Sequence, residues 1–191
     1  MAVVPPEEHQ GLIRVLTEAQ RIGALGTQPI VDIIAHARSF ADALPPAVTS
    51  CVDLGSGAGV PGLVVAVARP DIHITLVDRR SKRTDALLRA VRSLNLGDQV
   101  SVVCADIERF AQQPETKQSF DAACARGFGP PEFTLKWSAR LVKVGGVIVV
   151  SEPPPGSPDR WRDIDLRALG VSSPTRLGPV AMFHVEHTSF T

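Results

Sequence analysis

The sequence predicts an α/β fold, a doubly wound and mostly parallel sheet of seven strands with a small helical cap at the N-terminus. Apolar runs of strand length alternate with amphipathic helical segments between residues 48 and 151. Near-continuous apolar strands are expected where helices cover both faces of a parallel sheet. Two further strand-like runs near the end of the chain predict a C-terminal antiparallel hairpin that completes the sheet.

Two helices are expected before the sheet. The first spans Glu7–Leu25, with apolar residues at helical spacing and Gly26 as its stop. The second follows Thr27, its expected cap, and carries an apolar stripe that ends at Leu44. Two short amphipathic helices cannot bury their apolar faces alone, so both are expected to pack on the rest of the chain. We therefore expect a helical cap over residues 1–46 and one α/β domain over 47–191.

Within the α/β domain the expected elements alternate. Strands are expected at Ser50–Leu54, Ile72–Val77, Gln99–Cys104, Ser119–Ala125 and Val147–Ser151. Helices are expected at Pro61–Ala68, Lys82–Leu94, Ile107–Gln112 and Pro131–Val142. A short helix is expected around Trp161, and the closing hairpin pairs Thr175–Leu177 with Val180–Glu186.

The composition bounds the location and the partners of the protein. Lys and Arg total 20 against 20 Asp and Glu, whereas a free-standing RNA-binding protein is more often basic. The three cysteines, Cys51, Cys104 and Cys124, lie in apolar runs and are expected to be buried thiols of a reducing cytosol. No apolar run is long enough to cross a membrane, and residues 1–8 lack an export signal. A cytoplasmic protein without a membrane partner is expected.

A glycine-dense turn, Gly55-x-Gly57-x-Gly59, follows the first strand and leads into a helix that opens at Pro61. Such a turn lets backbone N–H groups approach a ligand without a Cβ in the way. A dinucleotide site is one interpretation, but it prefers the spacing G-x-G-x-x-G. S-adenosylmethionine is the other.

Two acidic residues favour S-adenosylmethionine. Asp78 ends the second strand and suits a ribose hydroxyl in either kind of site. Asp53 ends the first strand, where a carboxylate would repel a pyrophosphate but would suit the cationic methionine end of S-adenosylmethionine. The alternative for Asp53 is a helix-capping carboxylate.

Several motifs carry a resemblance to a known family. The string Asp53-Leu-Gly-Ser-Gly-Ala-Gly-Val-Pro-Gly62, followed by Asp78-Arg-Arg-Ser-Lys-Arg83, resembles the glucose-inhibited division protein B family. The segments Ala125-Arg126-Gly127-Phe128 and Leu135-Lys136-Trp137-Ser138 are similar to two further motifs of that family. The resemblance implies a class I S-adenosylmethionine-dependent methyltransferase that acts on guanine N7 of 16S ribosomal RNA. Its partner would be the small ribosomal subunit or its precursor.

The resemblance and the spacing together nominate a set of site residues. Cofactor contacts are implied at Gly55, Val60, Ile107, Glu108 and Arg126, and position adds Asp53, Gly57, Gly59, Asp78 and Asp106. An N-cap at Asp106 with Glu108 in the first helical turn is the alternative for that pair.

Substrate contacts are expected at His36, Lys82, Arg83 and Arg126. The basic stretch from Arg79 to Arg92 is either a phosphate-binding patch or a solvated helix face, with Leu87, Leu88, Val91 and Leu94 toward the sheet. Core packing is the alternative for His36.

No general base is expected, because guanine N7 has a free lone pair and carries no proton, so alignment matters most. A metal site is not expected either, since His184 and His187 point to opposite faces if they share a strand.

The chain also departs from the family pattern. It lacks an Asn-Leu-Thr element near the N-terminus, and its fifth strand ends in Ser151-Glu152 where the family usually has Lys-Gly. Two alternative functions follow: a diverged paralogue that methylates another RNA or a small molecule, or a regulatory protein that binds S-adenosylmethionine without methyl transfer.

Overall fold

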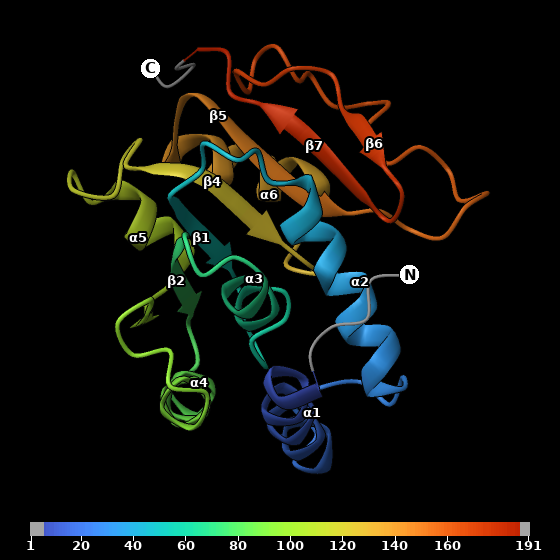
Figure 1. Cartoon of the computed structure of the whole chain (residues 1–191). Coiled ribbons are helices and arrows are strands. Elements are labelled where there is room, and N and C mark those ends of the chain that lie inside the picture. The colour runs from blue at the N-terminus through green and yellow to red at the C-terminus, as the bar shows by residue number, and fades with distance from the viewer. Residues whose placement is uncertain (1–5, 188–191) are drawn as a thin grey trace.

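A sheet of seven strands runs through the protein in the order β3-β2-β1-β4-β5-β7-β6 (Figure 1). The computed structural model describes residues 6–187. The strands are β1 (Ser50–Leu54), β2 (His73–Asp78), β3 (Val100–Cys104), β4 (Phe120–Ala125), β5 (Val142–Ser151), β6 (Thr175–Leu177) and β7 (Val180–His184). The first five strands are parallel, and β7 is antiparallel to both β5 and β6. The predicted doubly wound sheet with a C-terminal hairpin is confirmed.

Six helices of the described chain cover the two faces of this sheet. They are α1 (Pro6–Arg21), α2 (Ile30–Ala43), α3 (Gly62–Ala68), α4 (Ser81–Ser93), α5 (Ile107–Gln112) and α6 (Pro131–Leu141). Helices α1 to α4 share one apolar cluster with one face of the sheet, and α5 and α6 share a second cluster with the other face. Successive side chains of β1 alternate between them: Cys51 joins the first cluster and Val52 the second.

The two N-terminal helices pack as expected on the rest of the chain. Leu12 and Leu16 of α1 and Phe40 of α2 are fully buried in the same cluster as the first face of the sheet. This shared core packs α2 against β5 and β7, and the side of α2 that carries His36 borders the site described below. The division into units 1–46 and 47–191 stays a prediction.

Helix α1 ends at Arg21, so the predicted end at Leu25 is wrong. Gly23 adopts a left-handed conformation with φ of 71°, and the N–H of Ala24 donates to the carbonyl of Ala19 at 2.8 Å. This is the hydrogen-bond pattern by which a glycine just past the last turn closes a helix. Thr27 does not cap α2 either, because α2 starts after Pro29 and has no side-chain cap.

Two segments near the C-terminus also differ from the prediction. Strand β5 begins at Val142 rather than Val147, with an irregular register opposite β4. The residues around Trp161 form turns rather than a helix, and within them the Asp159 carboxylate accepts the N–H of Trp161 at 3.0 Å. Trp161 instead packs edge-on against Phe183, with ring centroids 4.8 Å apart. It therefore belongs to the second apolar cluster without needing a helix.

The cysteines divide into one exposed and two buried thiols. Cys51 and Cys124 are buried in β1 and β4, whereas Cys104 is exposed, so its predicted burial is wrong. The cause is position, since Cys104 ends β3 at the edge of the sheet.

This difference predicts the reactivity of the thiols. We expect a single thiol to react rapidly with a disulfide reagent such as DTNB in the native protein, and all three cysteines to react in denaturant, because only a solvent-accessible thiolate attacks. The substitution Cys104→Ser should remove the rapid phase. Rapid reaction of a second thiol in that variant would contradict the burial of Cys51 and Cys124.

No helix of the described residues is long and apolar enough to cross a membrane. Residues 1–5, which carry part of the segment expected to lack an export signal, lie outside the described residues.

Candidate active site

Two adjoining hollows lie where the carboxyl ends of β1, β2 and β4 meet. The larger cleft has a volume of about 1400 Å³ and the smaller hollow about 410 Å³. Gly55, Arg83 and Gly127 line both, so the two form neighbouring parts of one site. The carboxyl edge of the strands is the usual ligand position in open α/β sheets.

The glycine turn separates the two hollows and needs its glycines. Gly55 has φ of 66°, and a Cβ on it would lie 2.4 Å from the ring of Phe128. Gly57 has φ of 55° and donates its N–H to Asp78 at 3.0 Å. Gly59 lines neither hollow; a Cβ there would meet Leu63 at 2.3 Å, so this glycine allows close helix packing. The turn therefore brings backbone close to both hollows without side chains in the way.

Asp78 anchors the turn from the end of β2. Its side chain is only 5% exposed and lines the smaller hollow. It accepts the N–H groups of Gly57 and Arg80, at 3.0 and 2.9 Å, and the Arg83 guanidinium lies 3.5 Å away. Its carboxylate is therefore held in one orientation in the lining of the smaller hollow.

Asp53 lies beneath the turn and lines neither hollow. It is 1% exposed, and its Oδ2 accepts the N–H of Gly62 at the start of α3, at 3.2 Å. Its Oδ1 is buried without a hydrogen-bond partner. Burial raises the pKa of Asp53 to about 7, and the Ser56 hydroxyl, the Gly62 N–H and, less strongly, the Arg126 charge oppose that rise. The contact with Gly62 is the helix-capping alternative, while the unpartnered oxygen leaves one acceptor for a further group.

The end of the third strand closes the smaller hollow. Asp106 caps α5 by accepting the N–H of Glu108 at 3.0 Å, as the alternative for this pair predicts. Asp106 and Ile107 line the hollow together with the rings of Phe128 and Phe133, which lie 5.8 Å apart. Glu108 is exposed and is not part of the lining. This hollow thus combines apolar side chains with charged ones, the carboxylates of Asp78 and Asp106 and the guanidinium groups of Arg79, Arg80 and Arg83.

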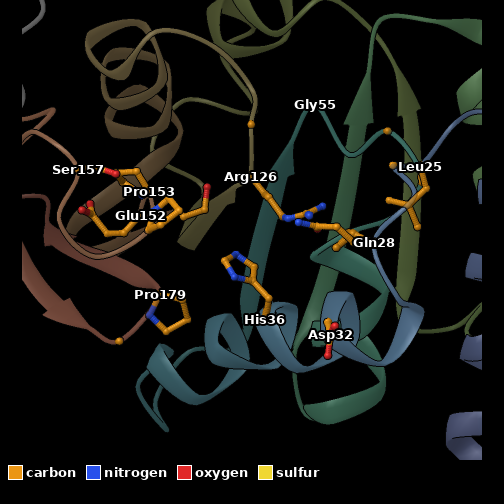
Figure 2. Close-up of a pocket in the computed structure, with 18 of the residues that line it drawn as sticks. Leu25, Gln28, Asp32, His36, Gly55, Arg126, Glu152, Pro153, Ser157 and Pro179 are labelled. Carbon is orange, nitrogen blue, oxygen red and sulfur yellow. The ribbon is translucent and has the colours of Figure 1, made fainter.

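Arg126 and His36 meet in the larger cleft. Arg126 follows β4, and Figure 2 shows the His36 ring rising from α2 beneath the Arg126 side chain. Burial and the Arg126 charge both lower the pKa of His36. Burial also lowers the pKa of Arg126, against the attraction of Asp53, yet a guanidinium stays charged at neutral pH. The cleft therefore holds a cation beside a neutral imidazole.

The sequence analysis did not predict the remaining walls of the cleft. They come from the α1–α2 loop, the segment after β5 and the β6–β7 turn. The lining residues are Ala24, Leu25, Gly26, Gln28, Asp32, Ser151–Asp159, Arg176, Gly178 and Pro179. The proline run after Ser151 was visible as an interruption of the regular pattern, but nothing local places it opposite α2 (Figure 2).

Glu152, the carboxylate next to Ser151, links this wall to the C-terminal hairpin. Its carboxylate accepts a hydrogen bond from Trp161 Nε1, and Oε2 lies 3.8 Å from Arg176. Arg160 stacks on the Trp161 ring at 4.6 Å and donates to the carbonyl of Ser151. Glu152 therefore orders the wall of the cleft, and Arg176 supplies a cation there.

The basic stretch on α4 is mostly a solvated helix face. Lys82 is exposed and lines neither hollow, whereas Arg83 lines both. Leu88 is 40% exposed, so its predicted burial against the sheet is wrong, although Leu87 is buried. Among the described residues no group of three or more His, Cys, Asp or Glu could hold a metal ion.

Known proteins resemble this chain in sequence over much of its length. A sequence model described as rRNA small subunit methyltransferase G matches residues 10–152. The ribosomal RNA small subunit methyltransferase G of Synechococcus sp. (strain WH7803) is 35% identical over 119 residues, which cover 62% of this chain and 44% of that protein. Its counterpart from Janthinobacterium sp. (strain Marseille) is 30% identical over 172 residues, 85% of this chain and 73% of that protein. The matched part of this chain spans less than half the length of the Synechococcus relative and of several other curated relatives.

Solved structures share the fold at low sequence identity. A putative S-adenosyl-L-methionine-dependent methyltransferase from Methanococcus maripaludis superposes with a TM-score of 0.64 at 16% identity, covering 98% of both chains. A putative O-methyltransferase from Klebsiella pneumoniae gives 0.66 at 12%, covering 98% of this chain and 93% of that one. The fold is that of class I methyltransferases. With the family sequence model matching most of its length, the chain belongs to the glucose-inhibited division protein B family, the rRNA small subunit methyltransferase G family.

Proposed function

We propose that this chain binds S-adenosylmethionine and methylates guanine N7 in the 16S RNA of the small ribosomal subunit. The observation that carries the proposal is the pair of adjoining hollows on either side of the Gly55 turn. The smaller hollow has an acidic residue at the end of β2 and apolar rings beside it, which suit an adenosine. The larger cleft is open, and the three arginines among its lining residues suit the phosphates of an RNA substrate, although three carboxylates line it as well.

The residues present fit the proposed cofactor. Asp78 and Asp106 line the smaller hollow as acceptors for ribose hydroxyls and an adenine amino group, and Ile107 and Phe128 supply apolar contacts. Gly55, Gly57 and Val60 line the larger cleft, where backbone is accessible. The unpartnered Oδ1 of Asp53 offers an acceptor for the cationic methionine end, directly or through water. Arg126 is positioned for a carboxylate or a phosphate.

Methylation of guanine N7 needs no general acid or base from the chain. S-adenosylmethionine supplies an electrophilic methyl group, and the guanine N7 lone pair forms the new N–C bond while the S–C electrons stay on sulfur. No proton leaves the base, so the protein needs to align N7 and to exclude water rather than to abstract a proton. The described cleft offers rigid walls for that purpose at α2 and at the proline-rich segment after β5.

Methyl transfer to isolated small subunits tests this function. We expect the protein to transfer labelled methyl groups to subunits from a strain that lacks N7 methylation, with the label recovered as 7-methylguanosine after nucleoside digestion. Asp78→Ala is the matched control, because it should abolish calorimetric binding of S-adenosylhomocysteine and transfer together.

Other outcomes select the two alternatives. Label in another RNA or in a small molecule would indicate a diverged paralogue, the alternative motivated by Ser151-Glu152 in place of the family's Lys-Gly. Cofactor binding without transfer would indicate a regulatory protein. The absence of any cofactor binding would contradict all three functions.

A further inference from the structure

Helix α2 has a polar side that borders the larger cleft. Its apolar side, including Ile33, Ala37 and Phe40, is buried in the core. Asp32 and His36 lie one turn apart on the opposite side, and both line the cleft. A helix that packs on the sheet thereby presents hydrogen-bonding groups to whatever enters the cleft (Figure 2).

His36 carries an unused hydrogen-bonding atom within this wall. Its Nε2 is buried and has no hydrogen-bond partner among the described residues. The imidazole ring is tilted against the Phe40 ring, with the ring centroids 6.0 Å apart. Nearly all buried polar atoms in proteins have a hydrogen-bond partner, and Nε2 finds none among the described protein atoms. Because His36 lines the cleft, a water or a ligand group in the cleft is a candidate partner. Core packing explains the Phe40 contact but not the orphan nitrogen.

The charge state of His36 restricts what it can bind. Burial and the Arg126 cation lower its pKa, so the ring is a neutral imidazole at pH 7 with one donor and one acceptor nitrogen. A guanine becomes positively charged when N7 is methylated, and a second cation beside it would oppose that change. A neutral ring can contact the base without this cost.

We propose that His36 is a specificity-determining residue, whose Nε2 hydrogen-bonds the six-membered ring edge of the guanine that is methylated. That edge carries O6 as an acceptor and N1–H and N2–H as donors, while N7 belongs to the other ring. A contact there leaves N7 free and fixes which base edge faces the cofactor. Arg126, beside His36, is then available for a phosphate or the methionine carboxylate. This inference rests on the function proposed above.

Charged side chains that line the cleft with His36 set the background for its titration, and Arg126 among them lowers its pKa. They are Asp32 on α2, Arg126 after β4, Arg83 on α4, Glu152 and Asp159 after β5, and Arg176 on β6.

Two substitutions separate the hydrogen bond from the packing. His36→Gln keeps an amide group at about the reach of Nε2, whereas His36→Phe keeps the ring on Phe40 and removes the nitrogen. We expect His36→Phe to lower kcat/KM for small subunits about 10- to 100-fold, the range expected for one good contact to a base edge. We expect His36→Gln to stay within about 5-fold of wild type, since an amide can make the same kind of bond. Both should bind S-adenosylhomocysteine and unfold thermally as the wild type does.

A pH profile supplies a readout that packing alone would not move. Wild-type kcat/KM should fall on the acid side as His36 is protonated, and the His36→Gln profile should lose that limb. His73→Phe is the matched control, since His73 is exposed at the start of β2 and bonds Ser101 at 3.0 Å, away from the cleft. It should keep the wild-type rate and profile.

Each outcome is decisive. Wild-type kcat/KM in His36→Phe, equal losses in both His36 variants, or an acid limb that persists in His36→Gln would overturn the role of His36 and leave the proposed function intact. Wild-type protein that makes no 7-methylguanosine would overturn both.

Discussion

Replacing Asp53 with Asn is expected to make the protein more stable at pH 8 and weaker in cofactor binding. In the wild type a carboxylate without a partner on Oδ1 is buried at the end of β1, and burial raises its pKa to about 7. At pH 8 the folded protein must therefore hold a buried charge that the unfolded chain holds in water. Asn has nearly the same shape, keeps an acceptor for the Gly62 N–H and carries no charge.

The pH dependence follows from the direction of this shift. The unfolded-state pKa of an Asp is about 3.9, so between that value and about 7 the folded protein binds a proton that the unfolded chain has released. Stability from this group is therefore lost as the pH rises through that window. One pKa unit corresponds to about 1.4 kcal/mol, and an advantage of about 1–3 kcal/mol for Asp53→Asn at pH 8 is expected. Near pH 4 the advantage should vanish, because Asp53 is then protonated in the folded state.

Thermal unfolding and calorimetry measure the two effects side by side. Unfolding of both proteins at pH 5 and pH 8 should show a stability difference that grows with pH. Titration with S-adenosylhomocysteine at pH 8 should show affinity about 10- to 100-fold weaker in the variant, because the proposed interaction of the Asp53 carboxylate with the cationic amino group, directly or through water, is lost. A variant destabilised equally at both pH values would mean that the negative charge of Asp53 stabilises the fold.

The sheet and the residues around the glycine turn were predictable from sequence for a physical reason. Strands buried on both faces are apolar throughout, and the glycine turn needs left-handed φ values that few other residues adopt, as at Gly55 and Gly57. Both signals are local in sequence. Because parallel strands place their carboxyl ends at one edge, residues that follow β1, β2 and β4 were expected to meet there, and Gly55, Asp78 and Arg126 do.

The walls of the larger cleft depend on contacts between segments that are distant in sequence, and such contacts leave no local signal. Nothing near Glu152 in sequence indicates that it binds Trp161 and Arg176, and nothing on α2 indicates which surface its polar side borders. The same limit applies to Cys104, whose exposure depends on β3 being at the sheet edge. Gly26 was expected to end the first helix, but α1 ends earlier, where Gly23 is left-handed and the N–H of Ala24 bonds the carbonyl of Ala19.

Gly62→Ala is expected to destabilise the protein by about 3–5 kcal/mol, from overpacking and a lost buried hydrogen bond together. A Cβ on Gly62 would lie 2.2 Å from Leu76 Cδ2 and 2.6 Å from Asp53 Oδ2. Leu76 is fully buried in β2 and Asp53 is buried in β1, so neither can move aside cheaply. Helix α3 must instead shift away from the sheet. This shift weakens the hydrogen bond from the Gly62 N–H to the Asp53 carboxylate, which is then buried without that donor.

The sign of the effect distinguishes this packing argument from helix propensity. Gly62 is the first residue of α3, and on propensity alone an alanine there would be neutral or stabilising, by up to about 1 kcal/mol. Gly97→Ala is the matched control, because a Cβ at Gly97 would meet nothing within 4 Å, and it should stay within about 0.5 kcal/mol of wild type. Urea unfolding of both variants measures the difference. Equal stability of Gly62→Ala and wild type would mean that α3 moves freely over β1 and β2, and the Asp53 carboxylate would then lack the rigid surroundings that raise its pKa.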